Sequence, residues 1–192
     1  FAYPFYVMSN SVLIGAYTSL IIAYIIAFLG IYGLGNLIGL SPLKRVLFFL
    51  FIFGNNVLIK MMTFGRFHEI LAWSLFSMTF MLLIYYKDKK IDKKAMFIAL
   101  GASLTILAHQ SIGVLIMVIF VGFLLAKKGE ELGKAFGLFL LSILGSSWWL
   151  IPAFFEARKN LIAKSGFLGV EAWWSFSLGT INFTKLALIL LP

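Results

Sequence analysis

Long apolar stretches separated by short charged segments run along most of the chain. None of them alternates apolar with polar positions, as a membrane barrel strand does. Helices are expected instead, because a helix satisfies its own backbone hydrogen bonds in an apolar solvent. The stretches cover residues 11–40, 46–59, 70–86, 95–108, 111–126 and 135–155, and a seventh starts near Ile181. The pattern predicts an all-α, polytopic transmembrane bundle of about six to seven membrane segments.

The composition favours lipid over water as the surrounding medium. Of the 192 residues, 62% are hydrophobic and 12% are charged, whereas soluble domains are about half apolar and about a quarter charged. The absence of cysteine excludes disulfides and thiolate metal sites. The chain begins at Phe1 and stops within an apolar run at Pro192. We therefore expect residues 1–192 to be a single transmembrane helical domain of a longer protein, truncated at both ends.

The lysines and arginines predict which ends of the helices face the cytoplasm. Loops on that side of a membrane protein are enriched in these residues. If the first stretch enters from outside, ten of the sixteen lie in the inner loops 41–45, 87–94 and 127–134. We interpret these lysines as topology signals. They account for the net charge of +9 without a nucleic-acid partner, and they predict an integral protein of the cell membrane.

Residues 95–126 contain no charged side chain and allow two topologies. As one helix they would extend about 48 Å. As a hairpin turning at His109-Gln110, each arm would reach only about 24 Å, which is less than the roughly 30 Å apolar thickness of a bilayer. Only the hairpin keeps both flanking lysine-rich loops inside. Its tip would then form the floor of an outward-facing cavity, because a polar tip at that depth needs water or protein around it.

Polar residues suited to binding or catalysis are concentrated on the predicted outer side. Arg66 follows Gly65, and its planar guanidinium suits bidentate binding of phosphate. The alternative is an arginine that reaches from a helix end to the interface. Glu69 and His68 are the candidates for catalytic acid–base groups, although Glu69 also suits an ion pair with Arg66 or a first-turn contact with the helix dipole. As sequence neighbours, these two should point to different helix faces.

Five further residues complete the candidate set. His109 is predicted to bind a phosphate or a sugar hydroxyl, or else to cap a helix. Arg158 and Lys159 are candidates for holding anionic headgroups or a lipid-linked phosphate. Trp173 and Trp174 are either interfacial aromatics or surfaces that stack on a sugar ring or a lipid tail. The two histidines lack the spacing of a metal motif, so no metal ligands are assigned and no cofactor is identified. A divalent metal ion stays an option, with ligands that are not seen in this sequence.

Short motifs carry a family resemblance. They are GRFHEILA at 65–72, LAHQ at 107–110, SWWLIP at 147–152 and the tyrosine-proline element YPF at 3–5. Together they resemble a group of prokaryotic polytopic membrane proteins described as 6-pyruvoyl-tetrahydropterin synthase-related, which are similar to the GT-C glycosyltransferases. The resemblance implies sugar transfer from a polyprenyl-phosphate-linked donor on the extracytoplasmic side, with Arg66 and His109 near the donor phosphate. It implies a catalytic carboxylate in a first outer loop that precedes this sequence.

Two other classes of function fit the same pattern. Interrupted helices at Asn55-Asn56 and His109-Gln110 are typical of transporters and of proteins that translocate lipids or glycolipids, although no internal repeat is visible. A membrane module that only binds a partner would also have this composition. It would tolerate substitution of the outer polar residues.

Overall fold

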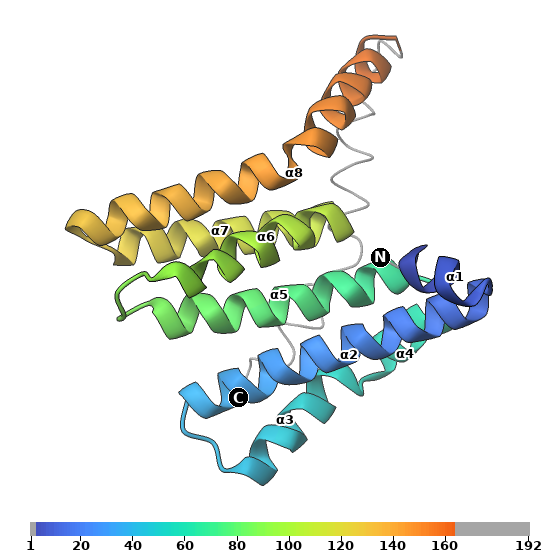
Figure 1. Cartoon of the computed structure of the whole chain (residues 1–192), viewed down its shortest axis with the longest axis horizontal. Coiled ribbons are helices and arrows are strands. Elements are labelled where there is room, and N and C mark those ends of the chain that lie inside the picture. Colours follow the sequence, from blue (N-terminus) through green and yellow to red (C-terminus); the bar gives the residue numbers. More distant parts are fainter. Residues whose placement is uncertain (1–2, 164–192) are drawn as a thin grey trace, which may run out of the picture. The chain divides into compact units, whose positions relative to one another are not determined.

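The computed structural model describes residues 3–163, and every regular element in that part of the chain is helical (Figure 1). The all-α class is therefore confirmed. The helices are α1 Tyr3–Ser9, α2 Val12–Leu37, α3 Pro42–Phe53, α4 Asn56–Thr63, α5 Phe67–Tyr86, the 3-10 turn η1 Lys93–Ala95, α6 Met96–Ala108, α7 Gln110–Ala126 and α8 Gly129–Ala163. The chain divides into two compact units, Phe1–Ser147 and Trp148–Pro192. The contacts described below belong to the first unit, and the single-domain assignment stays a prediction.

Two helices, α2 and α5, are long and apolar enough to cross a membrane. The pair formed by α3 and α4 is a third if it counts as one span bent by 55°. Within residues 3–163 this gives two or three candidate spans, so the expected six to seven segments are not confirmed. For α6 and α7 the reason is length, because they have 13 and 17 residues, fewer than the roughly 20 that a straight span needs. The seventh stretch, near Ile181, lies outside the described residues. The long apolar helices α2 and α5 are compatible with an integral membrane protein.

The packing of α2 against α5 places small residues inside and large apolar residues outside. The buried face of α2 includes Ala23, Ala27 and Gly30, whereas Ile21 and Ile25 are exposed. Helix α5 also buries small residues, Ala72, Ser74 and Ser77, and its backbone at Ser77 lies close to Gly30 of α2. Small residues let two helix backbones approach closely, and the large outward side chains suit lipid better than water.

Buried hydroxyl groups in this bundle bond back to their own helices. Ser74 donates to the Ile70 carbonyl at 2.7 Å, and Thr105 donates to the Gly101 carbonyl at 2.7 Å. Ser103 donates to the Ala99 carbonyl and to the carbonyl of residue 142 in α8, each at 2.9 Å. These buried hydroxyl groups are thereby satisfied without water, as an apolar solvent requires.

The predicted break at Asn55-Asn56 is confirmed. The α3 helix ends at Phe53, and Asn55 caps α4 by accepting hydrogen bonds from the backbone N–H groups of Val57 and Leu58. An asparagine at this position satisfies two amides that the start of a helix leaves unpaired. The stretch 46–59 is thus two short helices rather than one.

Residues 95–126 form the hairpin, and the single long helix is excluded. The tip residue His109 is extended, with φ −160° and ψ 119°, between α6 and α7. The two arms lie side by side (Figure 1), and a Cβ on Gly113 would come within 2.7 Å of the Ile106 Cα. At the far end of the hairpin, the Lys127 ammonium donates to the carbonyls of Tyr86 and Lys89 at 2.6 and 2.7 Å.

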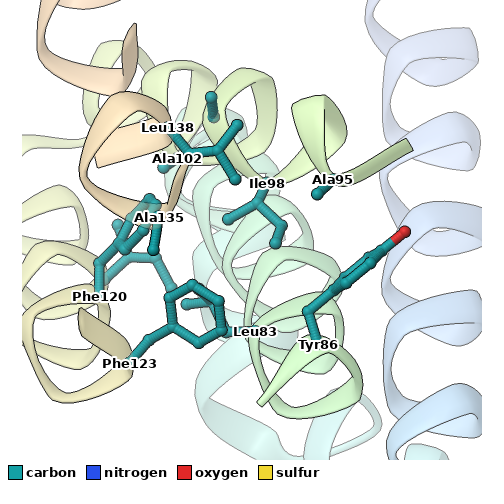
Figure 2. Packing of buried hydrophobic residues seen from close by; sticks show 11 residues of the cluster. Leu83, Tyr86, Ala95, Ile98, Ala102, Phe120, Phe123, Ala135 and Leu138 are labelled. Atoms are coloured by element: carbon teal, nitrogen blue, oxygen red, sulfur yellow. The ribbon is translucent and has the colours of Figure 1, made fainter. Parts of the chain in front are cut away.

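One apolar cluster fixes the hairpin against its neighbours. Figure 2 shows side chains from α5, α6, α7 and α8 gathered together, with Ile98 near the centre of the view. The cluster contains Leu83, Tyr86, Ala95, Ile98, Ala99, Ala102, Ile116, Phe120, Phe123, Ala135 and Leu138. Burial of Phe120 alone contributes on the order of 2 kcal/mol if it is transferred from water. The cluster lies at the half of the hairpin nearer Lys127.

The three lysine-rich loops gather at one end of the first unit. Helices α2 and α5 run in parallel, because Gly30 contacts Met78 and Gly33 contacts Met81. Their carboxyl ends therefore lie together, and Lys127 returns the chain to the same end. The Ile91 N–H donates to the Glu131 carboxylate there. This gathering agrees with the expected grouping of inner loops.

Side chains at the lysine-rich end of the first unit also have a structural role, because they hold the loops in place. Lys127 is buried and its ammonium bonds two carbonyl oxygens. The Tyr86 hydroxyl donates to Asp92 at 2.7 Å, and this hydrogen bond holds the pKa of the Asp92 carboxyl below its usual value. The interpretation of the inner-loop lysines as topology signals alone is thus too narrow for Lys127.

We expect Gly30→Ala to destabilise the fold by about 1–3 kcal/mol, because the added Cβ would lie 2.6 Å from the Met78 backbone nitrogen and force α2 and α5 apart. Gly122→Ala is the matched control, since a Cβ at that helical position meets nothing within 4 Å. Thermal unfolding of the two proteins in the same detergent provides the measurement. Equal midpoints would contradict the close α2–α5 contact.

Candidate functional site

A tight turn between α4 and α5 sets the position of Arg66. The N–H of Gly65 donates to the Met62 carbonyl, and the N–H of Arg66 donates to the Met61 carbonyl, which closes the carboxyl end of α4. Gly65 has φ 69°, a left-handed conformation that favours glycine, and a Cβ there would meet nothing. The glycine is therefore needed for the backbone, and Arg66 stands directly before the first turn of α5.

Arg66 and Glu69 form an ion pair across that first turn. The guanidinium contacts Glu69 Oε1 through both Nε and Nη2. The Glu69 side chain is only 7% exposed, and that of Arg66 is 39% exposed. A buried carboxylate costs free energy unless it is paired, and the arginine supplies the pairing. The ion pair that the sequence suggested is present, and part of the guanidinium still faces outward.

His109 joins this pair from the tip of the hairpin. Its Nε2 lies 3.7 Å from Glu69 Oε1, and its ring stacks on that of His68 with centroids 5.8 Å apart and planes 14° from parallel. The Nδ1 atom of His109 is buried and makes no hydrogen bond to any residue in the described part of the chain. A segment distant from Glu69 in the sequence thus completes the cluster.

His68 shares the cluster, which corrects the expectation that it points away from Glu69. Its Nε2 lies 3.8 Å from Glu69 Oε1, and the side chain is 60% exposed. Both residues sit in the first turn of α5, which begins at Phe67. Sequence neighbours in a helix still point in directions roughly 100° apart, which agrees with one exposed and one buried side chain. The expectation fails at the side-chain ends, because these two long side chains bring Nε2 and Oε1 within 3.8 Å of each other.

The four remaining predicted site residues fall within the second unit, Trp148–Pro192. Arg158 and Lys159 belong to the part of α8 in the second unit, and their side chains lie outside the described residues. The same holds for Trp173 and Trp174 as whole residues. Helix α8 also extends beyond the predicted stretch 135–155 at both ends, to Gly129 and Ala163. The roles proposed for these four residues remain predictions.

The arrangement supports two kinds of chemistry. The outward guanidinium edge and the imidazoles present donors to an anionic oxygen. The Glu69 carboxylate with two imidazoles offers ligands to a cation, since one atom from each of these residues lies within 4.8 Å of the others. The sequence did not indicate this second group, because the spacing of residues 68 and 109 matches no metal motif. Glu69 is already engaged by Arg66, so orientation of the arginine suits it better than proton abstraction.

We expect Arg66→Met to destabilise the protein by about 2 kcal/mol, and more than Glu69→Gln does, because only the arginine variant leaves a buried carboxylate without its partner. In Glu69→Gln the remaining charge is the half-exposed guanidinium, which water can reach. Chemical denaturation in detergent measures both, with exposed Lys60→Met in α4 as the control. A larger loss for Glu69→Gln than for Arg66→Met would contradict the asymmetry.

Comparisons with known proteins add no family to this picture. No family model, no curated protein and no solved structure matches the chain. The function therefore has to be argued from the site itself, and the likeness to GT-C enzymes stays an expectation.

Proposed function

We propose that this protein is a membrane glycosyltransferase of the GT-C type, which transfers a sugar from a polyprenyl-phosphate-linked donor on the extracytoplasmic side. One observation carries the proposal. Arg66, aimed by Glu69 and adjoined by His109, lies at the end of α5 opposite the lysine-rich loops. If those loops face the cytoplasm, the cluster faces outward.

The chemistry of the cluster suits departure of a lipid phosphate. An acceptor oxygen attacks the anomeric carbon, and the bond from that carbon to the phosphate oxygen breaks, with its electron pair leaving on the phosphate. A base takes the acceptor's proton. Arg66 would stabilise the charge that grows on the phosphate, and a histidine would donate a hydrogen bond to it. Glu69 holds the guanidinium in place before the reaction, so that little reorganisation is needed.

An apolar groove that includes Met62, a few residues before Arg66 in the chain, suits the tail of such a donor. Its volume is about 410 Å³, and it lies between α2 and the α3–α4 pair, with Leu20, Phe28 and Phe49 among its lining residues. Met62 also lines it, and the Met62 carbonyl accepts the Gly65 N–H in the turn before Arg66. A prenyl chain in the groove would therefore carry its phosphate toward the guanidinium.

A transporter is the second candidate, and the two chain breaks favour it. The interruption at Asn55 and the reversal at His109 resemble the discontinuous helices that bind substrate in secondary transporters. Uptake of a solute or glycolipid into vesicles, without any transfer of sugar, would favour this function over the first.

For the proposed transfer, Arg66→Ala should lower the rate by roughly 10²–10³-fold, since one electrostatic contact to the developing charge is lost. Transfer of radiolabelled sugar from polyprenyl phosphate in isolated membranes measures the rate. Lys60→Ala serves as the control, because it removes a cation from α4 without touching the cluster. A rate unchanged in a folded Arg66→Ala protein would remove Arg66 from the site.

For the proposed orientation, a cysteine at Ser111 should react with an impermeant thiol reagent on intact cells, and one at Lys128 should react only after permeabilisation. Both positions are exposed and lie near opposite ends of α7. The chain contains no other cysteine, so each signal belongs to one site. Labelling of Lys128→Cys alone on intact cells would place the cluster on the cytoplasmic side.

A further inference from the structure

Three side chains with metal-binding atoms converge where the hairpin tip meets the start of α5. One ligand atom each from His68, Glu69 and His109 lies within 4.8 Å of the others. We propose that these three residues form a binding site for a divalent first-row transition metal ion, with Zn²⁺ as its representative. The inference is independent of the proposed glycosyl transfer.

The distances suit a metal better than direct hydrogen bonds. Both Nε2 atoms lie 3.7–3.8 Å from Glu69 Oε1, which is too long for a hydrogen bond. Ligands about 2.0–2.1 Å from a tetrahedral zinc ion stand about 3.3 Å apart. The two histidine–glutamate distances would close by a few tenths of an ångström, and the ligand atoms of the two histidines, which lie within 4.8 Å of each other, would move further together. His68 can make this adjustment because its side chain is 60% exposed.

The chemistry of the donors selects the class of ion. Two imidazoles and one carboxylate suit zinc and its neighbours, whereas Mg²⁺ and Ca²⁺ prefer oxygen ligands alone. Three protein ligands also leave a fourth position for water or an anionic oxygen, as in catalytic zinc sites. The exposure of His68 places that position on the open side of the cluster.

The polar surroundings of the His109 ring also support a metal site. Its Nδ1 is buried without a hydrogen bond among the described residues, and its Nε2 faces the carboxylate at 3.7 Å. A ring 27% exposed that makes no short polar contact is unfavourable in a partly buried site. With Nε2 unprotonated, a cation between Nε2 and Oε1 would form a coordinate bond to each atom.

Arg66 would compete with the metal ion for the Glu69 carboxylate, and this competition can be tested. The guanidinium occupies Glu69 Oε1, the same oxygen that both histidines approach. A metal at that oxygen would displace the arginine or share the carboxylate with it, and two cations repel each other. Removing the arginine charge should therefore strengthen metal binding.

The test is titration of Zn²⁺ into the full chain, purified in detergent with a histidine-free tag and stripped with a chelator. A chromophoric chelator reports the affinity, and Co²⁺ reports the geometry through its visible absorption. We expect one equivalent to bind. His68→Gln and His109→Gln should each weaken binding roughly tenfold or more, and these are the only two histidines in the chain. Arg66→Gln should bind more tightly.

Glu130→Gln is the matched control, because Glu130 is an exposed carboxylate at the lysine-rich end and pairs with Lys134. It should bind as the unaltered chain does. Absence of an equivalent of bound Zn²⁺, unchanged affinity in His68→Gln, or weaker binding in Arg66→Gln would each overturn the site. If circular dichroism shows that His109→Gln does not fold, the Zn²⁺ affinity of His68→Gln tests the site alone, because that side chain is exposed. No sugar donor is present, so the result is separate from that of the transfer assay.

Discussion

The reversal of the chain at His109 determines most of what surrounds it. The uncharged run 95–126 is divided by one extended residue, whose own backbone N–H and carbonyl stay paired. The His109 N–H donates to the Thr105 carbonyl, and the His109 carbonyl accepts from the Gly113 N–H. A break with these partners is tolerable in an apolar environment, where an unpaired amide costs several kcal/mol. Because the chain turns here, Lys127 returns to the carboxyl end of α5 and the tip reaches its amino end.

Helix α5 connects the two polar ends that this reversal creates. Its first turn carries Glu69, and its last residue, Tyr86, accepts a hydrogen bond from the Lys127 ammonium at its carbonyl oxygen. Between them, α5 packs on α2 through small residues and satisfied hydroxyls. The cluster is thus mounted on a helix held along its length, while His68 and Arg66 stay partly exposed. Rigid support under exposed ligands is the arrangement that a binding site requires.

The sequence was informative about where the chain breaks and which polar residues share one end of the helices, and less informative about helix lengths and side-chain distances. The break at Asn55 could be predicted because asparagine caps helices, and Arg66, Glu69 and His109 could be grouped because the lysines sort the helix ends. The number of membrane spans could not be predicted, because apolar runs as short as α6 and α7 suit buried helices as well as membrane segments. The place of His68 depends on where α5 begins, and its contact with His109 depends on tertiary packing between segments far apart in the sequence.

Glu69 Oε1 belongs to both proposed sites, because it orients Arg66 for phosphate and would also bind the metal ion. It accepts from the Arg66 guanidinium and faces the Nε2 atoms of both histidines. In the metal-free arrangement the arginine is held by the carboxylate and has only its outer edge for an anion. A metal at Oε1 would weaken that hold and add a second positive centre beside the guanidinium. A phosphate bridging the metal and Arg66 would then compensate both charges, so metal and anion would each favour binding of the other.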